Sequence, residues 1–417
     1  MTRSRSFPWF TLSMLFAATA MSFLDRQVLS TLAPRIIAEF GMTNSAYAHV
    51  IFAFQLSYTV MSAMGGYLID RVGVKKGLAI SLGLWSVASA AHAFARGILM
   101  LGFARFVLGI GEGACFPAAT RGAADYAAPE KRSFATGFAI GGSALGAVIA
   151  PPLTVLLSVR FGWRGAFLFT GILGFVWLAF WLTLVPSASR TSTATRVPYS
   201  TLLRDRRLKW LLFARFLFDP VFYFYMFWIP QFLSRERGLS VESIGNMVWI
   251  PFFVLGISQI FGGKITDRLI ANGRDPVSAK SLMLLLAAVV TPISWISGWA
   301  TNVHWAIFCM SLLLFAHGIW ITNYLALAGD LFPKEQNASV VGLTGMIGGI
   351  GGMVSTLVVG PTIDHFSFVP VFAVSGVLYP LAYLCIRIAM SGHREVHDHS
   401  AHESPSIGAL APYKVPT

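Results

Sequence analysis

The sequence predicts an all-α integral membrane protein with twelve transmembrane helices in two pseudo-symmetric six-helix bundles. Of the 417 residues, 55% are hydrophobic and only 12% are charged, and the mean hydropathy is +0.67. A soluble domain of this size has far more charged surface than these residues can provide. The other two observations are the number of long apolar stretches and a repeat at half the chain length.

Each apolar stretch is about 20 residues long or longer, which is enough to cross the ~30 Å hydrocarbon core of a bilayer. The stretches run over residues 8–33, 46–69, 77–95, 98–122, 132–156, 163–186, 208–233, 243–266, 279–300, 303–328, 337–361 and 366–389. We read the first stretch as a retained span, because it is longer than the apolar core of a signal peptide.

The basic residues fix the orientation of these spans. With the N-terminus placed inside, 22 of the 31 Lys and Arg residues lie on the inner side, six lie outside and three lie within spans. Such an excess on one side marks the cytoplasmic face. Both termini are therefore predicted to be cytoplasmic. The net charge of +13 reports topology, and we expect no nucleic-acid partner.

The longest polar break divides the chain into two halves of six spans. We predict an N-terminal bundle over 1–186, a cytoplasmic linker over 187–207 and a C-terminal bundle over 208–390. Residues 391–417 are predicted to form a disordered cytoplasmic tail. The linker is short, so we expect no regular helices in it.

The two halves carry a similar short motif at corresponding places. The second span ends in GGYLIDRVGVKK from Gly65, and the eighth ends in GGKITDR from Gly262, 197 residues later. Repeats at half the chain length are typical of transporters that rock about a site near the bilayer midplane.

Several motifs resemble those of the major facilitator superfamily. The segment GGYLIDRVGVKKG resembles its signature between the second and third spans, and RFVLGIGEG from Arg105 resembles its fourth-span motif. Within the superfamily, FLDRQVLSTLAP, GIGEGACFPA and FGWRGAFLFTGILGF resemble the anion:cation symporter branch. The segments RFLFDPVFYFYMFWIP, FAHG and GLTGM are most similar to its hexuronate transporters.

The repeated motif predicts a breakable latch between the halves. Glycine lets a second helix approach closely, and an aspartate at a helix end can bind the positive end of a neighbouring helix. The alternative is an ordinary cytoplasmic loop held inside by its basic residues. The latch residues that we predict are Gly66, Asp70, Arg71, Asp267 and Arg268.

Six charged residues, three acids and three bases, lie within otherwise apolar spans. A charge near the bilayer centre costs roughly 3 kcal/mol even on lenient insertion scales, so such residues are functional candidates. A purely structural ion-pair network is the alternative, but buried pairs often add no stability. The residues are Asp25, Arg26, Arg105, Glu112, Arg215 and Asp219.

The depth of each residue along its helix groups the charged residues of the first half into two levels. At 1.5 Å per residue, Arg105 lies about 9 Å below the outer surface and Glu112 about 20 Å below it. Asp25 lies about 25 Å above the inner surface, level with Arg105, and Tyr58 lies level with Glu112. We therefore expect Arg105 to pair with Asp25, which leaves Arg26 and Glu112 toward a central site.

Chemistry and resemblance suggest roles for these residues. The guanidinium of Arg26 offers a fork of donors that fits a carboxylate. A desolvated carboxylate such as Glu112 can carry a proton. The resemblance implies proton coupling at Asp25 and Glu112, substrate binding at Arg26 and Tyr58, and Arg105 as the partner of Asp25.

The second half offers further candidates for substrate binding. Arg215 and Asp219 are four residues apart, a spacing that permits an intrahelical pair. They belong to the hexuronate-like segment, so we expect them to contact the substrate, although a self-satisfied pair that steadies the helix is the alternative. His317 lies about 20 Å into the tenth span and is either a site residue or a buried core histidine.

Together these features predict a proton-coupled symporter that imports a sugar acid, such as glucuronate or galacturonate, across a bacterial-type inner membrane. Import of another organic anion (tartrate, an aromatic acid or a dicarboxylate) is the first alternative, and a non-transporting membrane sensor is the second. Galactonate-type members of the branch tend to carry a carboxamide early in the eleventh span, and this chain has none there, so the resemblance disfavours galactonate. We expect no enzyme, because no metalloprotease, nucleophile-elbow or phosphate-loop motif is present. We also expect no metal and no cofactor, because the proton gradient would drive transport. We expect the protein to be a monomer in membrane lipid.

Overall fold

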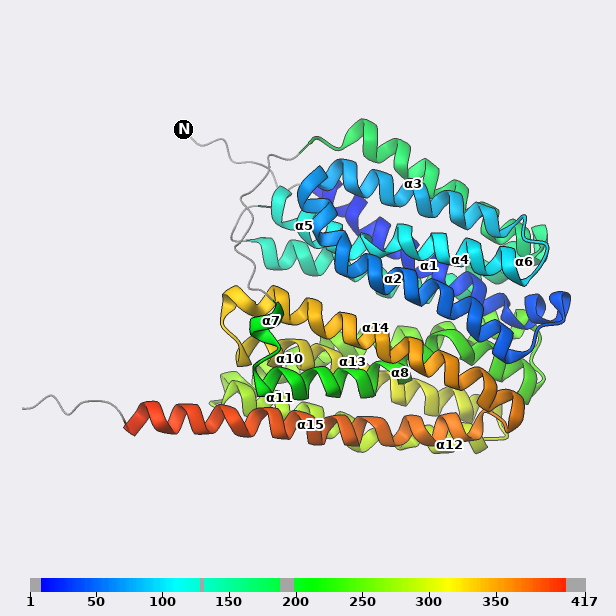
Figure 1. Cartoon of the computed structure of the whole chain (residues 1–417). Helices are drawn as coiled ribbons and strands as arrows, with labels where there is room; N and C mark the ends of the chain where they lie inside the picture. Colours follow the sequence, from blue (N-terminus) through cyan, green and yellow to red (C-terminus); the bar gives the residue numbers. More distant parts are fainter. Residues whose placement is uncertain (1–8, 128–130, 188–198, 403–417) are drawn as a thin grey trace, which may run out of the picture.

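The computed structural model describes residues 9–127, 131–187 and 199–402, and over these ranges all regular structure is helical. Figure 1 shows two stacked groups of roughly antiparallel helices, one built from the first half of the chain and one from the second. The predicted all-helical fold is confirmed.

The first group contains six helices. Helices α4 and α5 are separated by Ala114 alone and form one apolar span, Ile98–Tyr126. Helix α6 is 53 residues long, and Gly162 breaks it at a φ of 71°, a left-handed conformation that favours glycine. The helices are α1 (Trp9–Phe40), α2 (Asn44–Val72), α3 (Val74–His92), α4 (Ile98–Gly113), α5 (Cys115–Tyr126) and α6 (Arg132–Leu184).

The second group follows a short helix, α7 (Tyr199–Leu202), in the predicted linker. Helices α9 and α10 together form one apolar span, as do α11 and α12. The helices are α8 (Arg206–Arg237), α9 (Val241–Met247), α10 (Trp249–Ala271), α11 (Pro276–Val290), α12 (Ile293–Trp299), α13 (Val303–Leu331), α14 (Lys334–His365) and α15 (Val369–His402).

The span count agrees with the prediction. Eight described helices meet a length and hydropathy criterion for crossing a membrane, and one of them is α6, which its kink divides into two. Helices α1, α2 and α3 are additional long helices, of 32, 29 and 19 residues. Counting α6 twice and adding α1, α2 and α3 yields the twelve predicted spans.

Two boundary expectations require correction. Residues 199–202 of the linker form α7, whereas we expected no helix there. Helix α15 continues to His402, whereas we expected disorder from residue 391 onward. No proline interrupts 391–402, so nothing in that stretch forces the helix to stop. The rest of the predicted tail, 403–417, lies outside the described residues.

Glycines on α6 let it lie directly against α1. A Cβ atom placed on Gly146 would lie within 3.0 Å of the Ala20 Cα atom, and one on Gly142 would lie 2.5 Å from the Thr19 hydroxyl oxygen. Thr19 also donates a 2.7 Å hydrogen bond to the Ala139 carbonyl oxygen. Small residues allow this backbone contact, which membrane helices use in place of a hydrophobic driving force.

The two halves meet at their outer ends and diverge toward the inner side. Near the outer side, Ser30 of α1 donates to the Met226 carbonyl of α8 at 2.8 Å. Midway along the α2–α14 contact, a Cβ atom on Gly349 would lie 2.5 Å from the Thr59 hydroxyl. One turn further in, at Gly345, no described atom would lie within 4 Å. The central region is therefore closed toward the outside.

Candidate functional site

The first half holds a buried ion pair at the predicted depth of the central site. The Arg26 Nε atom of α1 lies 2.8 Å from the Glu112 Oε2 atom of α4. Ser22 lies one turn before Arg26 and donates to the same carboxylate oxygen at 2.9 Å. The two charged residues are only 4% and 0% exposed. The sequence placed both residues toward the centre but did not predict that they bind each other.

Aromatic rings surround the Arg26 guanidinium. Its Cζ atom lies 4.2 Å from the ring centroid of Tyr58, 4.8 Å from that of Phe23 and 5.4 Å from that of Phe54. A guanidinium above an aromatic face is stabilised by the ring quadrupole, more so when both are desolvated. The predicted neighbours Arg26, Tyr58 and Glu112 are thus brought together.

The predicted pairing of Arg105 with the Asp25 carboxylate is wrong in detail. Arg105 approaches Asp25, but its Nη1 atom donates to the backbone carbonyl at 3.5 Å. The Asp25 carboxylate instead accepts a 2.9 Å hydrogen bond from Ser89 of α3, whose hydroxyl lies 2.8 Å from that of Thr170 of α6. Depth correctly placed the two residues at one level. The depth of a residue does not tell in which direction its side chain points around the helix axis, and the Asp25 carboxylate points toward Ser89.

Several buried polar atoms around this cluster have no protein partner among the described residues. They include Glu112 Oε1, Arg105 Nε and Nη2, and both amide atoms of Gln55. Polar atoms buried in this way nearly always bind water or a ligand. The cluster therefore has spare hydrogen-bonding capacity for both anionic and hydroxyl groups.

The second half supplies a corresponding pair on α8. The Arg215 Nε atom lies 2.7 Å from the Asp219 Oδ2 atom, the intrahelical pair that the spacing permits. Arg215 also stacks over Phe218 and Tyr324, with centroid distances of 5.3 and 5.7 Å. The side chains of Arg215 and Asp219 are 15% and 9% exposed, so this pair is more accessible than the Arg26–Glu112 pair.

A glycine of α14 packs directly on the Arg215–Asp219 pair. A Cβ atom on Gly348 would lie 2.9 Å from Arg215 Nε and would overlap the Asp219 carboxylate. The helix backbone therefore forms one wall of the pair, and any larger residue at position 348 would displace the two charged side chains.

Tyr223 of α8 lies near both charged clusters. It is within electrostatic range of Arg26 and Tyr58 in the first half, and of Arg215 and Asp219 in the second half. These five residues come from α1, α2 and α8, which meet where the halves face each other. The geometry thus forms one central site with a cation from each half.

His317 is a buried, partnered residue in this structure. Its Nδ1 atom lies 2.5 Å from the Tyr379 hydroxyl, and its ring stacks on Phe222 at a centroid distance of 4.7 Å. It is 4% exposed. These contacts match the core-histidine alternative, and its role in substrate binding stays a prediction.

The latch residues lie at the inner ends of α2 and α10. Asp70 is bonded to Arg121 at 3.2 Å, and Arg121 is also bonded to Asp125 at 3.0 Å, so these ion pairs join α2 to α5. Gly65, next to the predicted Gly66, makes a close helix approach at this end of α2: a Cβ there would lie 2.8 Å from Ala114 Cα. Arg71 is exposed.

The second half does not repeat this network at the corresponding residues. Asp267 and Arg268 are exposed at the inner end of α10. Near the inner side of this half, Lys280 of α11 instead pairs with Asp330 of α13. The neighbouring Thr266 links α10 to α13 by donating to Asn323 at 2.6 Å. The proposed latch role of these residues therefore stays a prediction.

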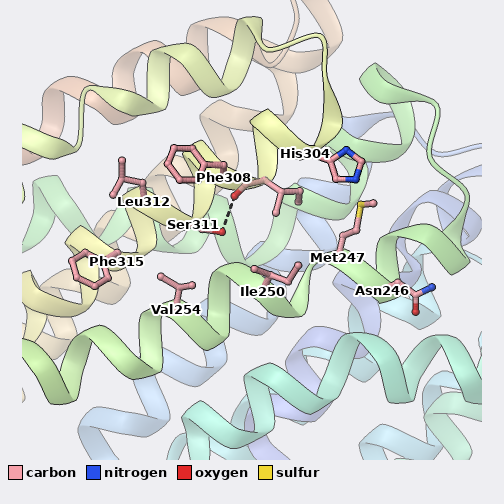
Figure 2. Close-up of a pocket in the computed structure, with 10 residues that line it drawn as sticks. Asn246, Met247, Ile250, Val254, His304, Phe308, Ser311, Leu312 and Phe315 are labelled. Atoms are coloured by element: carbon pink, nitrogen blue, oxygen red, sulfur yellow. Dashed lines mark hydrogen bonds between the residues drawn. The ribbon is translucent and has the colours of Figure 1, made fainter.

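A separate cavity of about 690 Å³ lies away from these charges, between α9–α10 and α13. Figure 2 shows mainly apolar side chains around it, with Asn246 and His304 at one end, and Ser311 bonded to the backbone of its own helix. A site for an anion needs cationic or donor groups. The central charged site is therefore the better candidate.

Sequence reasoning missed four polar residues that organise these contacts: Ser22, Ser89, Thr170 and Arg121. Ser22 carried a usable signal, because it lies four residues before Arg26 on the same helical face. Ser89 and Thr170 carried none, since single hydroxyl residues are common in membrane helices.

Comparison with known proteins agrees with this architecture. Residues 15–356 match the Major Facilitator Superfamily. The chain is 28% identical to the hexuronate transporter of Escherichia coli (strain K12), over 93% of this chain and 94% of that protein. It is 27% identical to the galacturonate transporter of Dickeya chrysanthemi, over 63% of this chain and 82% of that protein.

A solved structure supports the fold. The crystal structure of a bacterial homologue of the human lysosomal transporter Spinster, in an inward-facing and occupied conformation, has a TM-score of 0.74 at 17% identity. It covers 95% of this chain and 98% of that chain. Because the family match spans most of its length, the chain belongs to the Major Facilitator Superfamily, as a multi-pass inner-membrane transporter and not an enzyme.

Proposed function

We propose that the protein imports a sugar acid together with protons, and that a hexuronate such as glucuronate or galacturonate is the substrate. The observation that carries the proposal is the Arg26–Glu112 ion pair of the first half, with Tyr223 within electrostatic range both of Arg26 and of the Arg215–Asp219 pair of the second half. The similarity to hexuronate and galacturonate transporters supports the choice of substrate.

The ion pair itself suggests how proton and anion are coupled. Glu112 occupies the guanidinium that a substrate carboxylate would bind, and a protonated Glu112 no longer competes for it. Proton binding to Glu112 therefore favours anion binding to Arg26, and linkage requires the reverse as well. Asp25 is the second proton carrier in this proposal.

The second half would recognise the remainder of the sugar acid. Arg215 and Asp219 provide cationic donors and a carboxylate acceptor, groups that suit ring hydroxyls. The side chains of Tyr58 and Tyr223 add apolar faces and hydroxyl groups on either side of the centre.

A dicarboxylate is the second candidate, because the site holds two arginines, one from each half. Relatives of the chain include the probable galactarate/D-glucarate transporter of Bacillus subtilis (strain 168), at 26% identity. In this reading, Arg26 and Arg215 would each bind one carboxylate of an extended substrate.

Uptake into energised membrane vesicles tests the proposal. Labelled galacturonate should accumulate when the outside is acidic, and collapse of the proton gradient should abolish accumulation. Unlabelled glucuronate should compete strongly and galactarate weakly, whereas the reverse order would favour the dicarboxylate. If no member of a sugar-acid panel accumulates, the proposal is wrong.

A further inference from the structure

An aspartate from the second half caps a helix of the first half at the outer side. Asp364, near the end of α14, accepts hydrogen bonds from Asn44 N at 3.0 Å and Asn44 Nδ2 at 2.8 Å through Oδ1. Its Oδ2 atom accepts from Ser45 N at 2.8 Å and Ser45 Oγ at 2.6 Å. The first N–H groups of a helix lack intrahelical partners, and a negative charge there is favourable.

A second helix of the C-terminal half supports the same contact. Gln231 of α8 donates to the Asn44 side-chain oxygen at 3.3 Å. The start of α2 is thus bound to both α14 and α8, and these contacts must break before the outer ends of the halves can separate.

The register of α2 against α14 relates this contact to the predicted latch. The two helices run antiparallel, with Gly360 against Ala48 and Gly349 against Thr59, so equal steps of 11 residues separate the two contacts. Eleven further residues toward the inner side lead to Asp70 on α2 and to position 338 on α14. Position 338 lies near the start of α14, which begins at Lys334.

Each helix of the pair therefore carries an acid near its end, level with the first turns of the other helix. Asp364 is four residues beyond Gly360 and meets Asn44, the first residue of α2, whereas Asp70 is level with position 338, four residues after the first residue of α14. In the present structure the outer contact is made. At the inner end the helices diverge at Gly345, and Asp70 is bonded to Arg121 of its own half.

We propose that Asp364 is the outer-gate residue of the transport cycle and the reciprocal partner of Asp70. Its bonds to Asn44 and Ser45 hold the outer ends of α2 and α14 together while the inner side is open. Rocking of the halves breaks this cap and brings Asp70 to the start of α14. The two caps thus favour opposite conformations of one helix pair.

A cysteine reporter can measure this equilibrium. Ser30 is 1% exposed and lies at the closed outer contact, and the three native cysteines are all buried. In a Ser30→Cys protein, a membrane-impermeant thiol reagent added outside should react severalfold faster when Asp364→Ala is introduced. Adding Asp70→Ala should slow the reaction again, because it removes the cap that favours the outward-facing state.

Asp275→Ala is the matched control. Asp275 caps α11 by accepting from Ser278 N at 2.8 Å, entirely within the second half, so its loss should leave the labelling rate unchanged. Asp364→Asn keeps part of the cap and should have a smaller effect than Asp364→Ala. It also provides the test if the alanine variant fails to reach the membrane.

Unchanged labelling in a folded Asp364 variant would overturn the gate assignment. Labelling that Asp70→Ala fails to slow would overturn the reciprocity. The measurement uses no substrate, so its result is independent of whether the protein carries a hexuronate or protons.

Discussion

The guanidinium of Arg26 is held by the carboxylate of Glu112, at the position where we propose that the substrate anion binds. In this proposal the single contact makes anion binding depend on the charge of Glu112. Protein groups that stabilise one protonation state of a neighbour are the physical basis of such coupling.

Replacing Glu112 with glutamine should uncouple transport from protons. Glutamine is neutral, so it resembles the protonated acid and releases Arg26 permanently. We expect gradient-driven accumulation of labelled galacturonate to be lost, while exchange of internal for external substrate is retained. Glu39→Gln is the control, because Glu39 pairs with Arg164 in an exposed position. Unimpaired accumulation by Glu112→Gln would refute the proton role of Glu112.

Gly348→Ala should impair transport without unfolding the protein. The added methyl group would displace the Arg215–Asp219 pair. We expect uptake to fall at least tenfold, equivalent to about 1.4 kcal/mol, the order of cost for mild overpacking. Gly345→Ala, one turn away and in open space among the described residues, should transport normally. Equal activity of the two variants would show that α14 does not confine the pair.

At the scale of whole helices, glycine positions decide how closely neighbouring spans approach. Gly142 and Gly146 bring α6 onto the α1 backbone, while Gly137 and Gly141 of the same helix have no described atom within 4 Å of a Cβ position. The sequence showed a glycine-rich helix. Only the packing shows which of these glycines face a neighbour.

Gly146→Val should therefore destabilise the first bundle. Its side chain would overlap the α1 backbone at Ala20, and overpacking of this kind typically costs about 1–3 kcal/mol. Thermal unfolding in detergent should show a lower midpoint than in the unaltered protein. Gly141→Val should leave the midpoint nearly unchanged, because residue 141 is exposed. Equal midpoints would indicate that α1 moves away at little cost.

At the scale of the whole molecule, the halves touch at one side and separate at the other. The outer side is closed by Asp364 and by contacts such as Ser30 with the Met226 carbonyl. The central charged site is buried between the halves, so access to it changes with their relative orientation. A transporter built from two repeated halves uses this rocking to expose a fixed site to each side in turn.

Asp70→Asn should slow transport, because it weakens the inner latch while leaving the central site intact. We expect a reduced maximal uptake rate with an unchanged apparent affinity for galacturonate. Initial-rate measurements at equal protein abundance provide the check. Asp205→Asn, which alters a cap at the start of α8, is the comparison. Full activity of Asp70→Asn would count against a latch.

The sequence alone determined the class, the approximate bounds of the spans, the topology and the set of charges in the membrane. These follow from hydropathy, length and basic-residue placement, which are local properties of the chain. It also placed Tyr58 level with Glu112 and assigned Arg26 to the same central site, and the structure brings the three together.

The tertiary structure decided which groups bind each other. Asp25 and Arg26 are adjacent, yet Arg26 meets Glu112 of α4 whereas the Asp25 carboxylate meets Ser89 of α3. Sequence spacing fixes how deep a residue lies along its helix. Which neighbouring helix its side chain faces depends on how the helices are rotated and packed against one another. Contacts between the halves, such as that of Asp364 with Ser45, depend on the same packing and had no local signal.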